Sequence, residues 1–148
     1  MKTLETERLI LRDWSLSDIG CKVYDEQSIR YLVEAKNNYA VVQKESGTII
    51  GTIGLNEDAD DDPDVRNVGI RLLEPYWNQG LMSEALESVF QNTDISVKEF
   101  SYLCRADDKR SQHIAEKFGF QYVKTFYNVQ KNPTDEKKDF YYYRKSAR

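Results

Sequence analysis

The sequence predicts a mixed α/β fold, in which helices pack on a β-sheet. The chain has 148 residues, 40% of them hydrophobic and 31% charged, so it is long and apolar enough to bury one core of ordinary domain size. Apolar residues alternate in several short segments, as in half-buried strands, and recur at helical spacing in others. The two patterns follow one another in the order β-α-β-β-β-α-β-α-β-β, which is typical of a mixed sheet covered by helices.

The chain is expected to open with a strand and a helix. Apolar residues alternate over Arg8–Trp14, which predicts the first strand. The segment Ser15–Asp18 offers capping side chains, so a helix is expected to follow with its body over Ile19–Glu34.

A β-hairpin is expected next. The segments Tyr39–Lys44 and Thr48–Leu55 flank Glu45-Ser46-Gly47, and a short turn that contains glycine is typical of hairpins. Gly51 and Gly54 lie inside the second of these strands, which indicates a bulge or a close approach of two backbones.

The rest of the chain continues the alternation after an acidic segment, Asn56–Pro63, which we expect to be a solvated loop. The remaining strands are expected over Val65–Leu73, Val97–Cys104, Tyr122–Tyr127 and Asp139–Arg144, and the remaining helices over Leu81–Gln91 and Lys109–Phe118. No repeat, linker or low-complexity tract interrupts this order, so residues 1–148 are predicted to form one domain.

Composition argues against several classes of function. No apolar run approaches the ~20 residues that a membrane helix needs, and Met1–Arg12 does not resemble a signal peptide, so we expect a cytoplasmic protein without membrane contact. Two cysteines and one histidine cannot build a tetrahedral Cys/His zinc site, so no metal is expected. The net charge of −4 argues against a general nucleic-acid binder.

The join between a strand and a helix at Leu72–Ala85 is the sharpest candidate for chemistry. Gly80 lets backbone approach a ligand closely, and the helix that follows directs unpaired N–H groups and the positive end of its dipole outward, which suits a phosphate. A plain turn explains the same residues, because a single glycine before a helix is common. No Gly-Lys-Ser/Thr and no third glycine follow, so this is neither a Walker loop nor a Rossmann fingerprint.

The segment Tyr76–Ala85 resembles motif A of the GNAT N-acetyltransferases, in particular the branch that contains the ribosomal-protein N-terminal acetyltransferases (Rim type). Three other segments match in the order of the family: Leu4–Arg12 resembles the opening strand, Gly51–Leu55 the third strand, and Ser111 with Glu116–Phe120 the motif B helix. The resemblance implies the GNAT fold, a mostly antiparallel central sheet with splayed middle strands and flanking helices.

The resemblance also implies that acetyl-CoA binds as a co-substrate and that its acetyl group passes to an amine. In the family, the backbone that matches Ile70, Arg71 and Leu72 pairs with the pantetheine arm, and an N–H near Leu72 stabilises the developing oxyanion. The loop after this strand is expected to receive the pyrophosphate. The residues expected there are Trp77, Asn78, Gln79, Gly80, Leu81, Met82 and Ser83. Met82 replaces the small residue of the wider superfamily, which narrows the space beside the phosphates.

Motif B departs from the family pattern at two positions. Asp108 stands where Asn is usual, so it cannot donate an amide hydrogen bond to the cofactor, and its charge repels the phosphates if it points inward. Ala115 stands where many GNAT enzymes carry a Tyr thought to protonate the thiolate. Ser111, whose counterpart has been assigned that role in the Rim-type branch, is therefore the candidate proton donor. A hydroxyl bonded to the helix backbone explains Ser111 equally well.

The general base is left open. The position of a family Glu carries Gln130, so Glu74, Glu57 and water-mediated deprotonation remain as candidates. The acidic loop either attracts a cationic acceptor or is merely solvated. Tyr141–Tyr143 either are ordinary strand aromatics or line the substrate cleft in part, and Cys104 is expected in the core.

The function expected from the sequence is direct transfer of an acetyl group from acetyl-CoA to a primary amine, either a protein N-terminus or a small cationic amine. The alternative is a catalytically silent acyl-CoA-binding or sensing module of the same fold, which the departures at Asp108, Ala115 and Gln130 favour. The oligomeric state is left open, with a homodimer among the options. Ser15–Asn38 is short for the branch, in which two helices wall the acceptor site, so either the pocket is open or part of the natural chain is absent.

Overall fold

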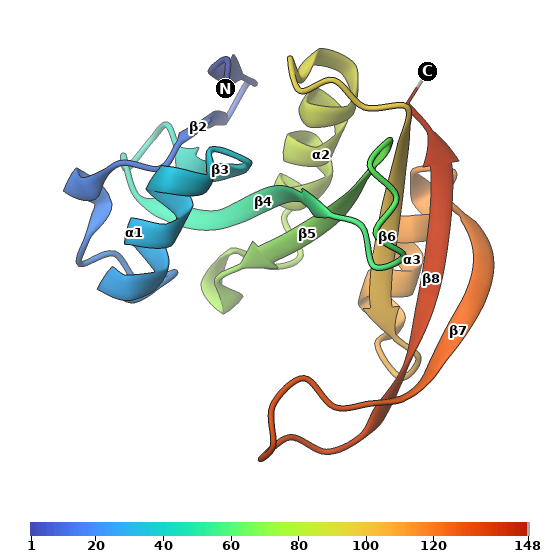
Figure 1. Cartoon of the computed structure of the whole chain (residues 1–148). Helices are drawn as coiled ribbons and strands as arrows, with labels where there is room; N and C mark the ends of the chain where they lie inside the picture. Colours follow the sequence, from blue (N-terminus) through green and yellow to red (C-terminus); the bar gives the residue numbers. More distant parts are fainter. Residues whose placement is uncertain (148) are drawn as a thin grey trace. The chain divides into compact units, whose positions relative to one another are not determined.

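The computed structural model describes residues 1–147 and confirms the mixed α/β class (Figure 1). Its strands are β1 (Leu4–Glu5), β2 (Leu9–Asp13), β3 (Asn38–Gln43), β4 (Ile49–Glu57), β5 (Val65–Leu72), β6 (Glu99–Arg105), β7 (Gln121–Val129) and β8 (Lys138–Ser146). Its helices are α1 (Glu26–Ala35), α2 (Leu81–Asn92) and α3 (Lys109–Lys117), with 3-10 turns η1 (Leu16–Asp18) and η2 (Glu74–Tyr76). Pairing between the strands is mostly antiparallel, as expected. The pair β5–β6 is parallel, whereas the antiparallel pairs are β1–β2, β2–β3, β3–β4, β6–β8 and β7–β8.

The chain divides into two compact units. The first unit comprises Met1–Asn56 and Gly69–Ser96, and the second comprises Glu57–Val68 and the chain from Val97 onward. Strand β5 therefore contributes its second half to the first unit and its first half to the second. The single domain expected from the sequence remains a prediction.

In the first unit, the order β1-β2-β3-β4 continues into the second half of β5. Helix α1 packs with Trp14 and Val23 against Ala40 of β3. The side chain of Tyr39, next in the chain to Ala40, must point to the opposite face of the sheet. There its hydroxyl is 2.7 Å from the hydroxyl of Thr93, the C-cap residue that follows α2. Helices α1 and α2 thus cover opposite faces of this part of the sheet.

Both expected features of the glycine-containing strand are present in the first unit. The register between β3 and β4 shifts at Val41/Val42, which marks a bulge or irregularity. A Cβ built on Gly51 would lie only 2.3 Å from the carbonyl oxygen of Arg71 in β5, so only glycine lets the two backbones come this close. The peptide N–H of Leu73 donates to the carbonyl of Ile50 at 2.9 Å and extends the contact between β4 and the end of β5.

The expected helix over Ile19–Glu34 is wrong in its first part. Ser15 and Asp18 form a capping box, but it caps only the 3-10 turn η1, after which Gly20 has a φ of 103° that no helix accommodates. Helix α1 begins at Glu26, where the side chain of Asp25 accepts a hydrogen bond from the N–H of Ser28 at 2.8 Å. The short strand β1, paired with β2 through Leu4 and Leu11, is a further element that the alternation did not indicate.

The second unit has the strand order β5-β6-β8-β7, with the first half of β5 at one side. The parallel ladder runs from Val65 opposite Glu99 to Asn67 opposite Ser101. Aromatic side chains fill this unit: Tyr102 packs 5.6 Å from Phe120 and 6.5 Å from Tyr143, measured between ring centroids. Within residues 1–147, no helix is both long and apolar enough to cross a membrane.

Candidate functional site

The loop between β5 and α2 is built by hydrogen bonds to its own carbonyl groups. The indole N–H of Trp77 donates to the carbonyl of Leu72 at 2.7 Å, and the side-chain amide of Gln79 donates to the carbonyl of Pro75 at 3.1 Å. Pro75 lies in the first turn of η2, where its lack of an N–H costs nothing. The loop is thus folded back on the end of β5 before α2 begins.

Two residues of this loop have left-handed backbone conformations. Asn78 has a φ of 62° and Gly80 a φ of 74°, and Gly80 is the N-cap residue of α2 without a side chain that could cap it. The N–H of Glu84 donates to the carbonyl of Gly80 at 3.1 Å, so the N–H groups of Leu81 and Met82 have no acceptor within the helix. Such a turn ahead of a helix directs N–H groups and the positive end of the helix dipole at an anion.

The side chains leave the backbone of this turn accessible. The nearest heavy atom to a Cβ built on Gly80 is Nη2 of Arg8, 3.7 Å away. Met82, expected to narrow the space beside the phosphates, is only 8% exposed, so its volume is buried in the protein rather than beside the turn. Trp77, Asn78 and Gln79 are exposed. The residues present therefore fit a pyrophosphate group.

The peptide groups at the end of β5 alternate between the two sides of the strand. The N–H of Leu73 and the carbonyl of Arg71 face β4. Because successive residues of a strand direct their peptide groups to opposite sides, the groups of Ile70 and Leu72 face away from β4. The carbonyl of Leu72 accepts from Trp77, whereas its N–H is the group predicted to stabilise the oxyanion.

Arg8 and Thr6 contact this turn and the start of α2, although neither carries a local sequence signal. Arg8 donates from Nε to Glu84 at 2.8 Å and from Nη1 to the carbonyl of Gln79 at 3.0 Å. Glu84 also accepts from the N–H of Arg8 at 3.0 Å and from the hydroxyl of Thr6 at 2.5 Å. Burial raises the pKa of Glu84, but these hydrogen bonds and the charge of Arg8 outweigh burial and hold that pKa below its ordinary value. Glu84 thus stays ionised with its charge balanced by Arg8.

The motif B residues lie in the second unit. Asp108 is the N-cap residue of α3: its carboxylate accepts from the N–H of Ser111 at 3.1 Å and from the hydroxyl of Ser111 at 3.0 Å. A cap explains why Asp serves at a position where Asn is usual, since both residues cap helices well. The hydroxyl of Ser111 also bonds to the side chain of Tyr102, whose pKa is raised to about 12 because burial outweighs this bond. Ser111 therefore has two polar neighbours, and its role as proton donor remains a prediction.

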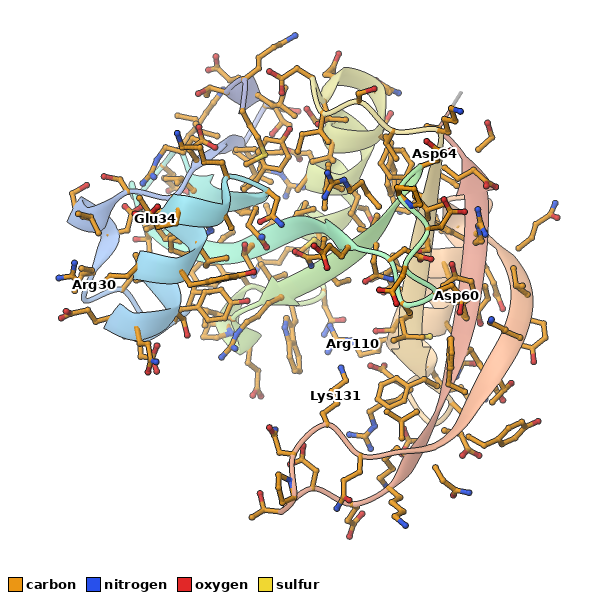
Figure 2. All side chains as sticks on the ribbon, viewed as in Figure 1. Arg30, Glu34, Asp60, Asp64, Arg110 and Lys131 are labelled. Atoms are coloured by element: carbon orange, nitrogen blue, oxygen red, sulfur yellow. The ribbon has the colours of Figure 1, made fainter. Side chains whose placement is uncertain are left out.

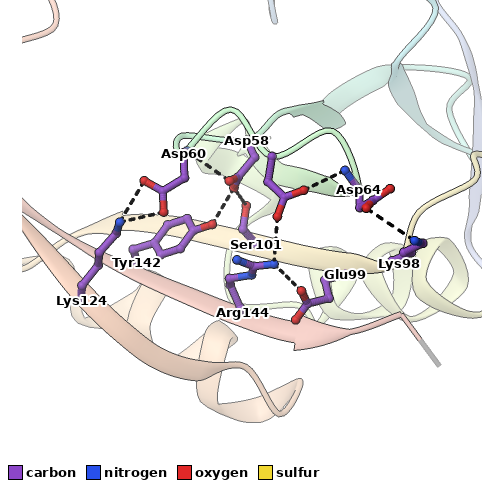
Figure 3. Close-up of polar contacts among 10 residues, drawn as sticks. Asp58, Asp60, Asp64, Lys98, Glu99, Ser101, Lys124, Tyr142 and Arg144 are labelled. Atoms are coloured by element: carbon purple, nitrogen blue, oxygen red, sulfur yellow. Dashed lines mark hydrogen bonds and ion pairs between the residues drawn. The ribbon is translucent and has the colours of Figure 1, made fainter.

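The expected solvated loop is wrong at Asp58, which is only 4% exposed (Figure 3). Its carboxylate accepts from the hydroxyls of Ser101 at 2.6 Å and Tyr142 at 2.7 Å, and from the N–H of Asp60 at 3.1 Å. Burial raises the pKa of Asp58, but these bonds and the nearby Arg144 outweigh it and keep that pKa below its ordinary value. Asp58 fastens the loop to β6 and β8.

Three acids in and beside this loop form ion pairs within the second unit, whereas Glu57 and Asp61 are exposed. Figure 3 shows Asp60 paired with Lys124 and Asp64 with Lys98, at 2.7 and 3.5 Å. A further pair joins Asp62 to Arg144 at 3.6 Å. A cationic acceptor would have to compete with the lysine and arginine side chains of these ion pairs. The pairs therefore weaken the interpretation that the loop attracts a cationic acceptor.

The remaining candidate site residues either form contacts that stabilise the fold or lie exposed on the surface. Gln130 donates to the carbonyl of Asp135 at 2.7 Å and so shapes the loop between β7 and β8. Glu57 and Glu74, the candidates for the general base, are both exposed. Tyr142 is fully buried against Asp58, whereas Tyr141 packs on Tyr122 with ring centroids 5.7 Å apart.

No metal site is formed by the described part of the chain: residues 1–147 contain no group of three or more His, Cys, Asp or Glu side chains that could hold an ion. The site consists of backbone amides and the ion-paired cluster of Thr6, Arg8 and Glu84.

Comparison with known proteins gives one family and one fold. Residues 22–121 match the family model described as an acetyltransferase (GNAT) domain. No curated protein sequence matches the chain. A GNAT-family acetyltransferase from Bacillus anthracis superposes with a TM-score of 0.78 at 18% identity, covering 99% of each chain.

Two other solved structures of the same fold are informative. An acetyltransferase from Salmonella typhimurium that modifies the N-terminal serine of the 50S ribosomal protein L7/L12 has a TM-score of 0.77 at 14% identity, covering 98% of this chain and 99% of that chain. The microcin C7 self-immunity acetyltransferase MccE, solved with acetyl-CoA and AMP, has a TM-score of 0.76 at 15% identity, covering 95% and 93%. At these identities the likeness shows the fold.

Proposed function

The chain belongs to the GNAT acetyltransferase domain family, as an acetyl-CoA-dependent N-acetyltransferase, and from this premise we propose that it transfers the acetyl group directly to a primary amine with the turn at Gly80 as its pyrophosphate site. The observation that carries the proposal is the left-handed turn at Asn78 and Gly80, followed by the first-turn N–H groups of α2. Acetyl-CoA supplies an activated thioester, which an uncharged amine can attack.

The residues of the chain bind and orient this donor. The N–H groups of Leu81 and Met82 hold the pyrophosphate, and the strand edge at Ile70 and Leu72 aligns the arm. The N–H of Leu72 stabilises negative charge on the carbonyl oxygen as the amine adds. Ser111 passes a proton to the departing thiolate and regains the proton that the amine nitrogen loses, so that the serine ends the reaction unchanged.

We propose the α-amine of a protein or peptide as the acceptor, ahead of a small cationic amine. An α-amine has a pKa of about 8, against about 10 for a lysine-like amine, so a useful fraction is uncharged near neutral pH. The candidates for the general base are Glu74, which is exposed, and a water molecule. Where base catalysis is weak, the amine whose ammonium form loses its proton most easily reacts best, because only the uncharged amine attacks. Asp60, Asp62 and Asp64 are already paired with cationic side chains, which reduces the negative charge that they offer to a polycation.

The test is release of free thiol from acetyl-CoA in the presence of an amine panel. The panel holds peptides with free N-termini, the same peptides with blocked N-termini, polyamines, amino acids and aminoglycosides. We expect turnover with free N-termini and none with blocked ones. Turnover with polyamines alone would contradict the choice of acceptor, and tight CoA binding without turnover on any amine would favour the silent module.

The role of Ser111 is tested by Ser111→Ala. We expect a fall in kcat of about 100-fold, the size of a typical general-acid contribution, with the KM for acetyl-CoA nearly unchanged. An unchanged kcat would leave Ser111 with a structural role beside Asp108 and Tyr102 and would remove it from the mechanism.

A further inference from the structure

We infer that Arg8 is a positioning residue for the donor, which holds the peptide between Gln79 and Gly80 in the orientation that receives the pyrophosphate of acetyl-CoA. Arg8 precedes β2 and is far in the sequence from the turn that it supports. The inference rests on the proposed function, because it concerns the same pyrophosphate site.

Arg8 orients the peptide group between Gln79 and Gly80. Nη1 of Arg8 donates to the carbonyl of Gln79 at 3.0 Å. The carbonyl of Gln79 and the N–H of Gly80 belong to the same planar trans peptide, in which they point in opposite directions. Arg8 therefore fixes the carbonyl on its own side and turns the N–H of Gly80 to the other side. Glycine with a positive φ allows this peptide to rotate easily, so an external anchor is needed to hold it.

Arg8 also balances the negative charge of Glu84. This carboxylate lies in the first turn of α2, where an unbalanced negative charge would repel a bound phosphate group. Nε of Arg8 at 2.8 Å, the N–H of Arg8 at 3.0 Å and the hydroxyl of Thr6 at 2.5 Å all donate to it. One guanidinium thus both balances Glu84 and holds the turn, which requires the forked donor geometry of arginine.

The side chain of Arg8 is also placed to act without being part of the core. It is 46% exposed, so its replacement should leave the folded state largely intact. Arg30 on α1 provides a matched control in the same unit (Figure 2). Its side chain is 58% exposed and pairs with Glu26 at 3.0 Å, away from the turn. Arg30→Ala removes the same charge and one ion pair.

The experiment measures the Kd of two probes by calorimetry, CoA and pantetheine, for the wild-type chain, Arg8→Ala, Arg8→Lys and Arg30→Ala. Pantetheine carries the thiol arm of CoA without the pyrophosphate and the nucleotide. We expect Arg8→Ala to weaken CoA binding about tenfold, as loss of a charged hydrogen bond does, and to leave pantetheine binding unchanged. Arg30→Ala is expected to change neither.

Arg8→Lys separates charge from geometry. A single ammonium can balance the charge of Glu84 but cannot hold the carbonyl of Gln79 at the same time. We therefore expect the Kd of Arg8→Lys for CoA to lie between the Kd of Arg8→Ala and that of the wild-type chain. Wild-type affinity in Arg8→Lys would show that charge alone suffices and would overturn the anchoring of the peptide.

Two further results overturn the inference in different ways. Unchanged CoA binding in Arg8→Ala refutes it while the proposed function stands, and equal loss of CoA and pantetheine binding shows a general structural defect instead. If the wild-type chain binds no CoA, the proposed function falls and the role of Arg8 falls with it.

Discussion

Gly80 is the residue on which the proposed site most depends, and its requirement for glycine is conformational. Its φ of 74° costs a non-glycine residue roughly 1–2 kcal/mol, whereas a Cβ there meets nothing closer than Arg8 at 3.7 Å. Gly80→Ala is expected to relax the turn, place a methyl group beside the anion and weaken CoA binding about tenfold, as measured by calorimetry.

Gly47 supplies the control for this change. It has a similar φ of 68°, no atom within 4 Å of a built Cβ, and a place in the turn between β3 and β4. Gly47→Ala should lower the free energy of unfolding by about as much as Gly80→Ala does, and it should keep the wild-type affinity for CoA. If both variants lose CoA binding equally, the effect of Gly80→Ala reflects stability and not the site.

Cys104 gives a prediction about reactivity. It is 5% exposed, and burial together with the charge of Asp108 raises the pKa of its thiol to about 11. Since the thiolate is the reactive form, Cys104 is expected to be almost inert to a disulfide reagent at pH 8, whereas the half-buried Cys21 reacts. Counting accessible thiols before and after denaturation checks this. Rapid reaction of both thiols in the folded protein would contradict the burial of Cys104.

At the residue scale, local signals were predictable and distant partners were not. Gly80 was identified because a glycine before a helix is visible in the sequence. The ion pair of Arg8 with Glu84 was not identified, because 76 residues separate its members and neither has a local signature. The capping role of Asp108 was also missed, although Asp directly before a helix is a preferred N-cap residue.

Among the elements, the turn η1 is held by a buried ion pair that makes its stability depend on pH. Asp18 is 7% exposed and accepts from both terminal nitrogens of Arg12, at 2.9 and 2.8 Å, and from the N–H of Ser15 at 2.8 Å. Burial raises the pKa of Asp18, but the bonds from Arg12 and Ser15 outweigh it and leave that pKa below its ordinary value.

Because the pKa is lower in the folded than in the unfolded chain, ionised Asp18 stabilises the fold above the unfolded value of about 4, and this contribution is lost as pH falls through the folded value. Asp18→Asn is expected to cost about 2 kcal/mol of unfolding free energy at pH 7 and progressively less below pH 4, as measured by urea unfolding. Asp25→Asn, which keeps an N-cap side chain on α1, is the control and should change stability little. A cost of Asp18→Asn that does not shrink in acid would contradict this account.

The elements themselves differ in how far the sequence predicted them. Helix α2 was expected over Leu81–Gln91 and spans Leu81–Asn92. The prediction is accurate because the apolar face of the helix and the glycine before it are both local signals. Helix α1 was expected too early, because the capping side chains of Ser15 and Asp18 do not distinguish a 3-10 turn from an α-helix. The positive φ of Gly20 that ends this turn is a property of the folded backbone.

For the whole molecule, the order of the main elements and the family followed from pattern and motif, whereas the buried polar contacts did not. Asp58 was expected in a solvated loop because its neighbours are acidic. Its partners Ser101 and Tyr142 lie 43 and 84 residues further along the chain, and only the folded second unit brings them together. Hydrophobic periodicity records which faces are buried but not which polar groups are satisfied inside.

The central claim is that the backbone amides of the turn at Gly80 bind the pyrophosphate of acetyl-CoA. The most direct measurement is a titration of the isotopically labelled chain with CoA, followed by the ¹H–¹⁵N shifts of its backbone amides. The account predicts that the amides of Gly80, Leu81 and Met82 shift most and saturate together, and that pantetheine leaves them in place. Saturable CoA binding that leaves these three amides unmoved would contradict it.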